Sequence, residues 1–373
     1  MTARATGLLG LLLVLICACT PSPEGRAAAD TGPRPGTESP IPATTPFPTV
    51  PTVPTVPTVP TVPRRPADPD AAVRGGDTAV GEPFRRSTFD AAVVREASGI
   101  AVSRTVPGRA YLVDDGRGVF LLDLDSGAVK ALSVSVPTGQ RALRMRDLED
   151  VAVGPCGPGD ARSCVYVGDI GDNRRRRHVV EVWRFEEPPG PAPAGPAPAA
   201  ALVDAIRLTY PGGPQDAEAL IVDDAGTPLI ISKAPYDQSA QTTGETRVYR
   251  APGFADGELA DLGAMDLPEP AVGILSGFVG NVVTGADRLG DRVLLRTYDS
   301  VLLLQPPQAG ARTALQDGVG ADLTGLAGWE ARELRPSPLP QAEAVAFLPD
   351  GDAYVTVSEH VGGVWQAALP AHR

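Results

Sequence analysis

The chain has 373 residues and a formal net charge of −12, with 45 acidic against 33 basic side chains. A nucleic-acid-binding protein needs a basic face, so this balance argues against that class and we expect no nucleic-acid partner. Beyond the N-terminal apolar run, no stretch approaches the ~18 apolar residues that a membrane-crossing helix requires.

The N-terminus has the features of a secretion signal. Arg4 supplies a short basic start, residues 8–16 are almost entirely aliphatic, and Ile16-Cys17-Ala18-Cys19 follows. An apolar residue three positions before Cys19 and a small residue directly before it resemble the lipobox of bacterial lipoproteins. The resemblance implies that residues 1–18 are removed and that a lipidated Cys19 anchors the protein to the outer face of the cytoplasmic membrane. An ordinary signal peptide cleaved nearby is the alternative.

Residues 19–84 form a predicted disordered tether. Within it, residues 20–70 contain 15 of the 40 prolines and a single aromatic residue, Phe47. Such a stretch cannot bury enough apolar surface to offset its conformational entropy. From Thr49 to Pro63 the triplet Thr-Val-Pro occurs five times, which favours an extended polyproline II spacer. We therefore predict a spacer between the anchor and a folded domain that covers residues 85–373.

Two cysteines remain beyond the signal, in a loop rich in glycine and proline. Cys156 and Cys164 are eight residues apart, and a secreted domain occupies an oxidising compartment, so we expect a disulfide across a turn. A zinc site would need two further ligands, and the three histidines show no metal-binding spacing.

The folded region contains short β-rich runs without convincing helical periodicity. Five units share one layout: a polar residue, a short apolar strand, a turn, a second apolar strand and a polar or charged residue at its end. The units begin at Ser98, Glu149, Glu218, Thr284 and Glu343. The spacings between these starts are 51, 69, 66 and 59 residues, which leaves room for a third and a fourth strand in each unit.

Repetition of four-stranded antiparallel sheets predicts an all-β fold, a β-propeller with five blades. The last unit is one strand short, and residues 88–94, ahead of the first unit, are expected to complete it. Six blades are the alternative, because residues 251–283 have room for a degenerate unit. A β-sandwich is the main competing fold, but it does not explain why three of the five units open on glutamate.

Several phrases resemble a group of secreted bacterial propeller lipoproteins with WD-repeat-like sequences and no settled activity. They are D-L-E-D-V-A-V, Y-V-G-D-I-G-D-N, D-A-E-A-L-I-V-D, V-T-G-A-D and L-R-T-Y. More distantly, an acidic residue that opens the inner strand is similar to the layout of phytase-like and gluconolactonase-type propellers. That second resemblance implies bound calcium and hydrolysis of phosphate or lactone esters.

The first two strands of a propeller blade are antiparallel, so the start of the first and the end of the second lie at the same rim of the central channel. The predicted rim carries six acids and two bases: Asp114, Glu149, Asp169, Glu218, Glu343, Glu359, Lys233 and Arg296. Crowded carboxylates require salt bridges, protonation or a cation. Oxygen ligands of this kind suit Ca²⁺ or Mg²⁺ better than zinc, and we expect Ca²⁺. Lys233 and Arg296 are candidate anion-binding residues. The alternative is that the acids only cap strand ends.

The sequence lacks the G-x-S-x-G, H-E-x-x-H, P-loop and Rossmann motifs, which argues against several enzyme classes. We therefore expect a monomeric, lipid-anchored, extracytoplasmic propeller that acts as a binding or recognition module for a ligand or protein of the cell envelope. The alternative is a divalent-metal-dependent hydrolase of phosphate or other esters that uses the acidic rim. The fold alone does not decide whether the protein is an enzyme.

Overall fold

The computed structural model describes residues 82–137, 143–190, 199–201, 204–273, 275–307, 322–334 and 342–370. The chain separates into two units, Met1–Val73 and Arg74–Arg373, and all described residues belong to the second. The predicted signal peptide, Cys19 and residues 19–81 of the predicted tether therefore lie outside the described residues. Within the described ranges, no helix is long and apolar enough to cross a membrane.

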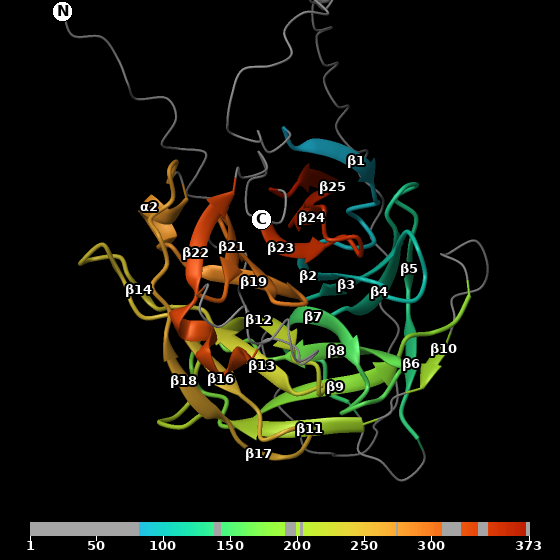
Figure 1. Ribbon diagram of the computed structural model, residues 1–373, viewed down its shortest axis with the longest axis horizontal. Helices are drawn as coiled ribbons and strands as arrows, with labels where there is room; N and C mark the ends of the chain where they lie inside the picture. Colours follow the sequence, from blue (N-terminus) through green and yellow to red (C-terminus); the bar gives the residue numbers. More distant parts are fainter. Residues whose placement is uncertain are drawn as a thin grey trace, which may run out of the picture. The chain divides into compact units, whose positions relative to one another are not determined.

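The second unit is a five-bladed β-propeller (Figure 1). Each blade has four antiparallel strands in order from the channel outward. Blade 1 contains β2 (Ala97–Val102), β3 (Arg109–Asp114), β4 (Gly118–Asp123) and β5 (Val129–Ala131). Blade 2 contains β7 (Leu148–Pro155), β8 (Ser163–Asp169), β9 (Val180–Glu186) and β11 (Asp204–Thr209).

The other three blades follow in chain order. Blade 3 contains β12 (Ala217–Val222), β13 (Pro228–Ser232), β16 (Arg247–Arg250) and β18 (Ala260–Ala264). Blade 4 contains β19 (Val283–Leu289), β20 (Arg292–Thr297), β21 (Val301–Gln305) and β22 (Glu330–Leu334). Blade 5 contains β23 (Ala342–Phe347), β24 (Ala353–Ser358), β25 (Val361–Ala368) and β1 (Phe84–Thr88).

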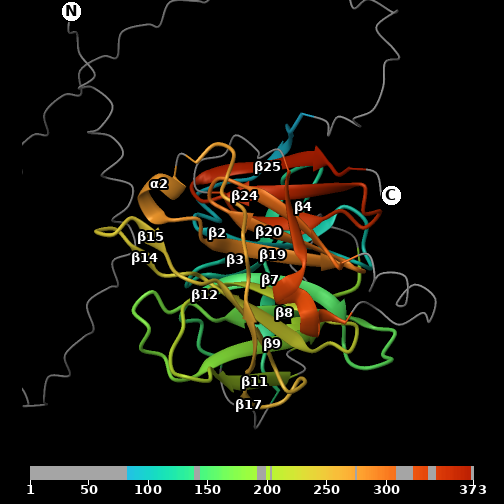
Figure 2. The ribbon, with the colours of Figure 1, turned by 60° about the vertical axis from the view of Figure 1, so that its left-hand side comes forward.

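Shorter elements lie outside this pattern. They are β6 (Ser133–Ser135) with β10 (Ala199–Ala201), the hairpin β14 (Tyr236–Asp237) with β15 (Thr242–Thr243), β17 (Gly257–Glu258) beside β11, α2 (Ser276–Val279) and a 3₁₀ helix at Leu323–Gly328. Figure 2 shows α2 beside the β14–β15 hairpin, where Asn281 N donates to Thr243 Oγ1 at 3.2 Å.

The ring closes through the N-terminal strand. The inner strands β2, β7, β12, β19 and β23 neighbour one another in that order, and β23 returns to β2. β1 pairs with β25 across the closure (Figure 1), which confirms the predicted mode of completion but with residues 84–88 in place of 88–94. Asp90 explains the shift, because its side chain accepts from Ala92 N at 2.8 Å and its carbonyl from Val94 N at 3.2 Å, folding this segment into a turn.

The five-blade count is confirmed and the six-blade alternative is wrong. The region 251–283 contributes β18 to blade 3, β17 to the edge of blade 2, and α2. The five apolar cores follow from the strand pattern, because alternate side chains of a strand buried on both faces enter the two neighbouring interfaces. In β20, for example, Leu294 packs in the core shared with blade 5 and Leu295 in the core shared with blade 3.

A buried carboxylate joins several blades in the middle of the channel. Asp150 on β7 is 1% exposed and accepts hydrogen bonds from Val151 N at 2.8 Å, Leu220 N at 2.8 Å and Ala286 N at 3.2 Å. It thereby links blade 2 to blades 3 and 4. Gly99 of blade 1 permits the close approach, since a Cβ there would lie 2.7 Å from Asp150 Oδ1. Asp150 is therefore a structural tie of the fold.

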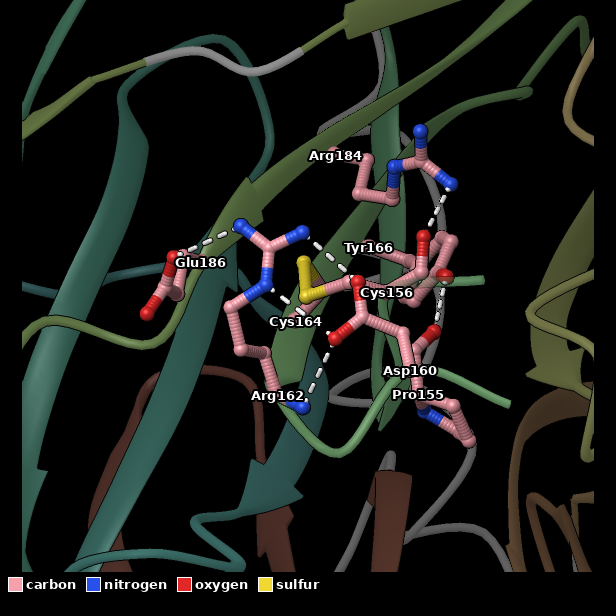
Figure 3. The surroundings of a disulfide bond; sticks show 8 residues. All are labelled: Pro155, Cys156, Asp160, Arg162, Cys164, Tyr166, Arg184 and Glu186. Carbon is pink, nitrogen blue, oxygen red and sulfur yellow. Dashed lines mark hydrogen bonds and ion pairs between the residues drawn. A yellow bond between two sulfur atoms is a disulfide. The ribbon is translucent and has the colours of Figure 1, made fainter. Parts of the chain in front are cut away.

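The predicted disulfide is confirmed. Cys156 and Cys164 are bonded, with their Cα atoms 4.9 Å apart (Figure 3). The bond closes the loop between β7 and β8, where Arg162 Nη2 pairs with Asp160 Oδ2 at 2.6 Å and its Nη1 with Glu186 Oε2 at 3.2 Å. Arg184 donates to the Cys156 carbonyl at 2.6 Å, which holds the loop against β9.

Candidate binding site at the acidic mouth of the channel

A β-bulge lies at the start of the inner strand in every blade. At each bulge one residue of the inner strand is skipped in the pairing with the second strand. The skipped residues are those at which the sequence units begin: Ser98, Glu149, Glu218, Thr284 and Glu343. A bulge redirects its side chain, and the three glutamates interact with one another electrostatically at one end of the channel.

Lys233, directly after β13, lies among these glutamates. Its ammonium forms an ion pair with Glu218, and its Nζ donates to the Tyr298 hydroxyl at 3.2 Å. Burial lowers the pKa of Lys233, but the attraction of Glu218 and of neighbouring groups more than offsets this and holds the pKa well above its usual value. Lys233 is therefore charged.

We call this group the acidic mouth. It comprises six acids around one base: Asp147, Glu149, Asp216, Glu218, Glu343, Glu359 and Lys233. Glu149, Glu218 and Glu343 are each less than a tenth exposed. Arg177, which pairs with Asp169, also lowers the pKa of Asp147, but six ionised carboxylates would still exceed Lys233 and Arg177 by four charges. Protons or a cationic ligand must therefore be held here.

Carboxyl groups of the mouth interact closely in two pairs. Asp147 accepts a hydrogen bond from the Glu149 carboxyl, and the Glu343 and Glu359 carboxyls hydrogen-bond to each other. Each of these bonds requires one protonated partner. Burial and the neighbouring carboxylates therefore keep part of the mouth protonated.

Burial is the largest cause of the raised pKa values of the mouth carboxyls. Burial, then the charges of Glu218 and Asp147, raise the pKa of Glu149 well above its usual range. Burial raises the pKa of Glu218 to about 7 although Lys233 opposes the shift. Burial and Asp216 raise the pKa of Asp147 to about 6. At neutral pH the Glu218 carboxyl is thus close to the midpoint of its titration.

Asp114 and Asp169, which were predicted at the rim, act as strand-end caps. Asp114 Oδ2 accepts from Arg95 N at 2.6 Å and Glu96 N at 3.2 Å. Asp169 Oδ1 accepts from Asp147 N at 3.2 Å and pairs with Arg177 Nη2 at 2.7 Å. Both carboxylates thus cap strand ends, as the capping alternative describes, although Asp114 Oδ1 has no hydrogen-bond partner among the described residues and lies 3.7 Å from Arg117 Nε.

The reason is a one-residue difference in register. Asp114 and Asp169 pair with Ala97 and Leu148, and the matching partners in blades 3 and 5 are Ser232 and Ser358. Lys233 and Glu359 come one residue later. Because side chains alternate along a strand, one residue separates a capping position from a position that faces the mouth.

Arg296, predicted as an anion-binding residue of the rim, lies away from the mouth. Its register partner is Gly285, its side chain is 1% exposed, and its Nε donates to the Ala342 carbonyl at 3.3 Å. Burial lowers the pKa of Arg296 to about 10. Of the two predicted bases, Lys233 is the one that contacts the acids.

Three residues of this region were missed by sequence reasoning. Asp147 and Asp216 precede Glu149 and Glu218 by two positions, and a spacing of two places side chains on the same face of a strand. The repeated Asp-x-Glu pattern was therefore a usable signal. Tyr298 had none, because an aromatic residue at a strand end is ordinary.

A buried hydroxyl faces the same group of acids. Tyr210 is 6% exposed, and its hydroxyl has no hydrogen-bond partner among the described residues. Burial and the neighbouring carboxylate of Asp216 raise its pKa. The protein thus leaves a donor at the edge of the acidic mouth that a ligand or water can satisfy.

The described part of the chain contains no group of three or more His, Cys, Asp and Glu residues that could hold a metal ion. The mouth carboxyls instead hydrogen-bond in pairs or bind Lys233. The predicted Ca²⁺ therefore stays a prediction, with Glu149, Glu218, Glu343 and Glu359 as the predicted ligands that face the mouth.

Comparisons with known proteins do not assign a family. No protein-family profile and no curated protein matches the chain. Among solved structures, a Myxococcus xanthus glutaminyl cyclase matches with 11% identity and a TM-score of 0.37, covering 79% of this chain and 97% of that one. A protein from Thermus thermophilus described as a glucose dehydrogenase matches with 12% identity and a TM-score of 0.39, covering 78% of this chain and 100% of that one. A Xanthomonas campestris gluconolactonase matches with 12% identity and a TM-score of 0.34, covering 70% of this chain and 69% of that one. Scores this low carry no functional argument.

Proposed function

We propose that the chain is a lipid-anchored, extracytoplasmic recognition module that binds a positively charged group at the acidic mouth. The observation that carries the proposal is the imbalance of six buried or half-buried acids around Lys233. A cationic group would let protonated carboxyls ionise and would replace shared protons with charge-assisted hydrogen bonds.

Exposed apolar side chains on the same face support a ligand larger than a simple ion. Six large hydrophobic residues are exposed in the described part of the chain, and five lie at the mouth end: Val93, Met145, Val272, Phe278 and Val361. Four belong to segments that lead into an inner strand and Val361 follows β24, so all belong to the end where inner strands begin. Charge at the centre with apolar contacts around it suits a basic segment of a peptide or protein.

Cys19 and the proline-rich stretch support the location. A lipidated Cys19 would hold the protein at the outer face of the cytoplasmic membrane, and two acyl chains anchor stably where one chain binds marginally. Cys19→Ala should therefore lose lipid labelling and leave the membrane fraction. A wild-type protein without lipid, or a mutant that remains membrane-bound, would contradict this part of the proposal.

The recognition proposal can be tested by calorimetry with a short basic peptide, Lys-Leu-Lys-Leu, and its acidic counterpart, Glu-Leu-Glu-Leu. The full chain should bind the basic peptide and release protons at pH 6, because carboxyls with raised pKa values ionise on binding. Glu149→Gln with Glu343→Gln should weaken binding by about tenfold or more. The control Asp350→Asn, an exposed acid at the other end of blade 5, should not.

The response to calcium distinguishes the recognition module from the alternative, a metal-dependent hydrolase. If the mouth serves a metal-dependent hydrolase, millimolar Ca²⁺ should raise the melting temperature and support phosphate- or lactone-ester hydrolysis, and both effects should disappear in Glu149→Gln. If it is a recognition module, the basic peptide binds with or without chelator and ester hydrolysis is absent. Failure of the peptide to bind at low salt would overturn the recognition proposal.

A further inference from the structure

The end of the channel opposite the acidic mouth holds a cleft of different character. It has a volume of about 270 Å³, and its walls include the last residues of β12 and β19 and the loop closed by the disulfide. The charged residues that line it are three arginines and two aspartates: Arg104, Arg162, Arg288, Asp160 and Asp224. Each arginine is paired with a carboxylate: Arg104 with Asp287, Arg162 with Asp160 and Glu186, and Arg288 with Asp224.

Arg104 is held across the channel. Its backbone N–H donates to Glu187 Oε1 at 3.1 Å, and its Nη2 donates to the Arg288 carbonyl on blade 4 at 3.0 Å. Glu187 is itself buried and also accepts from Tyr111 at 3.1 Å. Asp287 Oδ1 is the nearest carboxylate, at 3.6 Å from Nη2. Blade 2 thus holds the backbone of Arg104, and blade 4 holds its guanidinium.

Three residues of the cleft have donors that the protein does not use. Arg104 Nη1, Arg288 Nε and Ser163 Oγ are buried, and none has a hydrogen-bond partner in the described part of the chain. The Arg288 side chain is 7% exposed, and its two terminal nitrogens already bind Asp224 at 2.7 and 2.8 Å. Buried donors without acceptors are costly and rare, so three around one cleft indicate a ligand that supplies acceptor oxygens.

We propose that this cleft is a second binding site, which takes the carboxylate or phosphate group of a small molecule. Guanidinium groups suit such oxyanions because their fixed, planar donors match the spacing of two oxygens. The site is independent of the acidic mouth, since it lies at the other end of the channel and offers unused hydrogen-bond donors in place of carboxylates.

The disulfide gives this site a redox dependence. Arg162 and Ser163 belong to the loop that the Cys156–Cys164 bond closes, and both line the cleft. Figure 3 shows Arg162 held between Asp160 and Glu186 beside this bond. Opening the loop would release one wall of the cleft, so reduction should weaken oxyanion binding.

Calorimetric titration of the full chain with inorganic phosphate, and separately with succinate, at low ionic strength tests the proposal. Saturable binding of at least one is expected, with chloride at matched ionic strength giving none. The stronger of the two identifies the source of the oxyanion. Arg104→Gln and Ser163→Ala should each weaken that binding, Arg104→Gln by about tenfold or more and Ser163→Ala by several-fold.

The matched control is Arg250→Gln. Arg250 also pairs with an aspartate, Asp223, at 2.8 Å, but it does not line the cleft. Its loss should leave affinity unchanged, whereas Cys156→Ser with Cys164→Ser should lower affinity several-fold while circular dichroism still shows the β-sheet. Absence of saturable binding to both probes, or equal effects of Arg250→Gln and Ser163→Ala, would overturn the proposal. Phosphate binding that survives Glu149→Gln separates this site from the acidic mouth.

Discussion

Glu149 and Asp150 are consecutive residues of β7, but their side chains lie in opposite electrostatic environments. Asp150 points into the middle of the channel, where three backbone N–H groups from three blades donate to it. Glu149 is carried by the bulge to the end of the channel, where its neighbours are Glu218, Asp147 and Asp216. Both are nearly buried, at 7% exposure for Glu149 and 1% for Asp150.

The difference shows that the neighbours of a buried carboxylate, and not burial alone, decide its effect on stability. A buried carboxylate surrounded by donors strengthens the structure, because each N–H would otherwise lack a partner. A buried carboxylate surrounded by other carboxylates weakens it, because desolvation and repulsion both penalise its charge. Such an arrangement is typical of functional sites, where stability is given up for binding or chemistry.

The largest expected effect is at Asp150. Asp150→Ala removes the acceptor of three buried N–H groups, so it should lower the free energy of unfolding by about 3–5 kcal/mol. Urea unfolding measures this change. The exposed control Asp350→Asn should change stability by less than about 0.5 kcal/mol. A loss at Asp150 no larger than at Asp350 would remove its role as a tie between blades.

Lys233→Met should be next in size and should depend on pH. The substitution removes the partner of buried Glu218, and leaving one member of a buried pair is costly. At pH 8 we expect a loss of about 2 kcal/mol, but at pH 5 much less, because protonated glutamates no longer need the ammonium. An equal loss at both pH values would mean that Lys233 contributes through packing alone.

The wild-type protein should lose stability as pH rises from 5 to 7.5. Burial raises the pKa of Asp147 to about 6 and of Glu218 to about 7, above the values of roughly 4 in an unfolded chain. Between those limits the native state binds more protons than the unfolded state, so the free energy of unfolding falls with pH. We expect a fall of about 1–2 kcal/mol, measured by urea unfolding in steps of half a pH unit. A rise across this window would contradict the assigned shifts.

The repeat was readable from the sequence because each blade must bury its strands on both faces and must end in a turn. The start of every inner strand was therefore located to within one residue, at Ser98, Glu149, Glu218, Thr284 and Glu343. Ring closure and the disulfide followed from the missing strand and from the spacing of the cysteines.

The sequence did not show in the same way which side chains face the acidic mouth. The bulge shifts the register by one residue, and no local pattern marks it, so Arg296 was expected at the mouth in place of Tyr298. The opposite cleft was missed for another reason. Arg104, Arg162 and Arg288 come from three different blades and share no motif, so only the closed ring brings them together.

The central claim is that the charged carboxylates of the acidic mouth lower the stability of the folded protein. Unfolding free energies of Glu149→Gln and Asp150→Asn, measured at pH 5 and pH 8, test it most directly. Glu149→Gln should stabilise the protein by about 1 kcal/mol at pH 8 and have little effect at pH 5, because it removes a charge whose neighbours oppose it. Asp150→Asn should destabilise at both pH values. If Glu149→Gln destabilises at pH 8 as much as Asp150→Asn does, the mouth is a compensated structural network and the account is wrong.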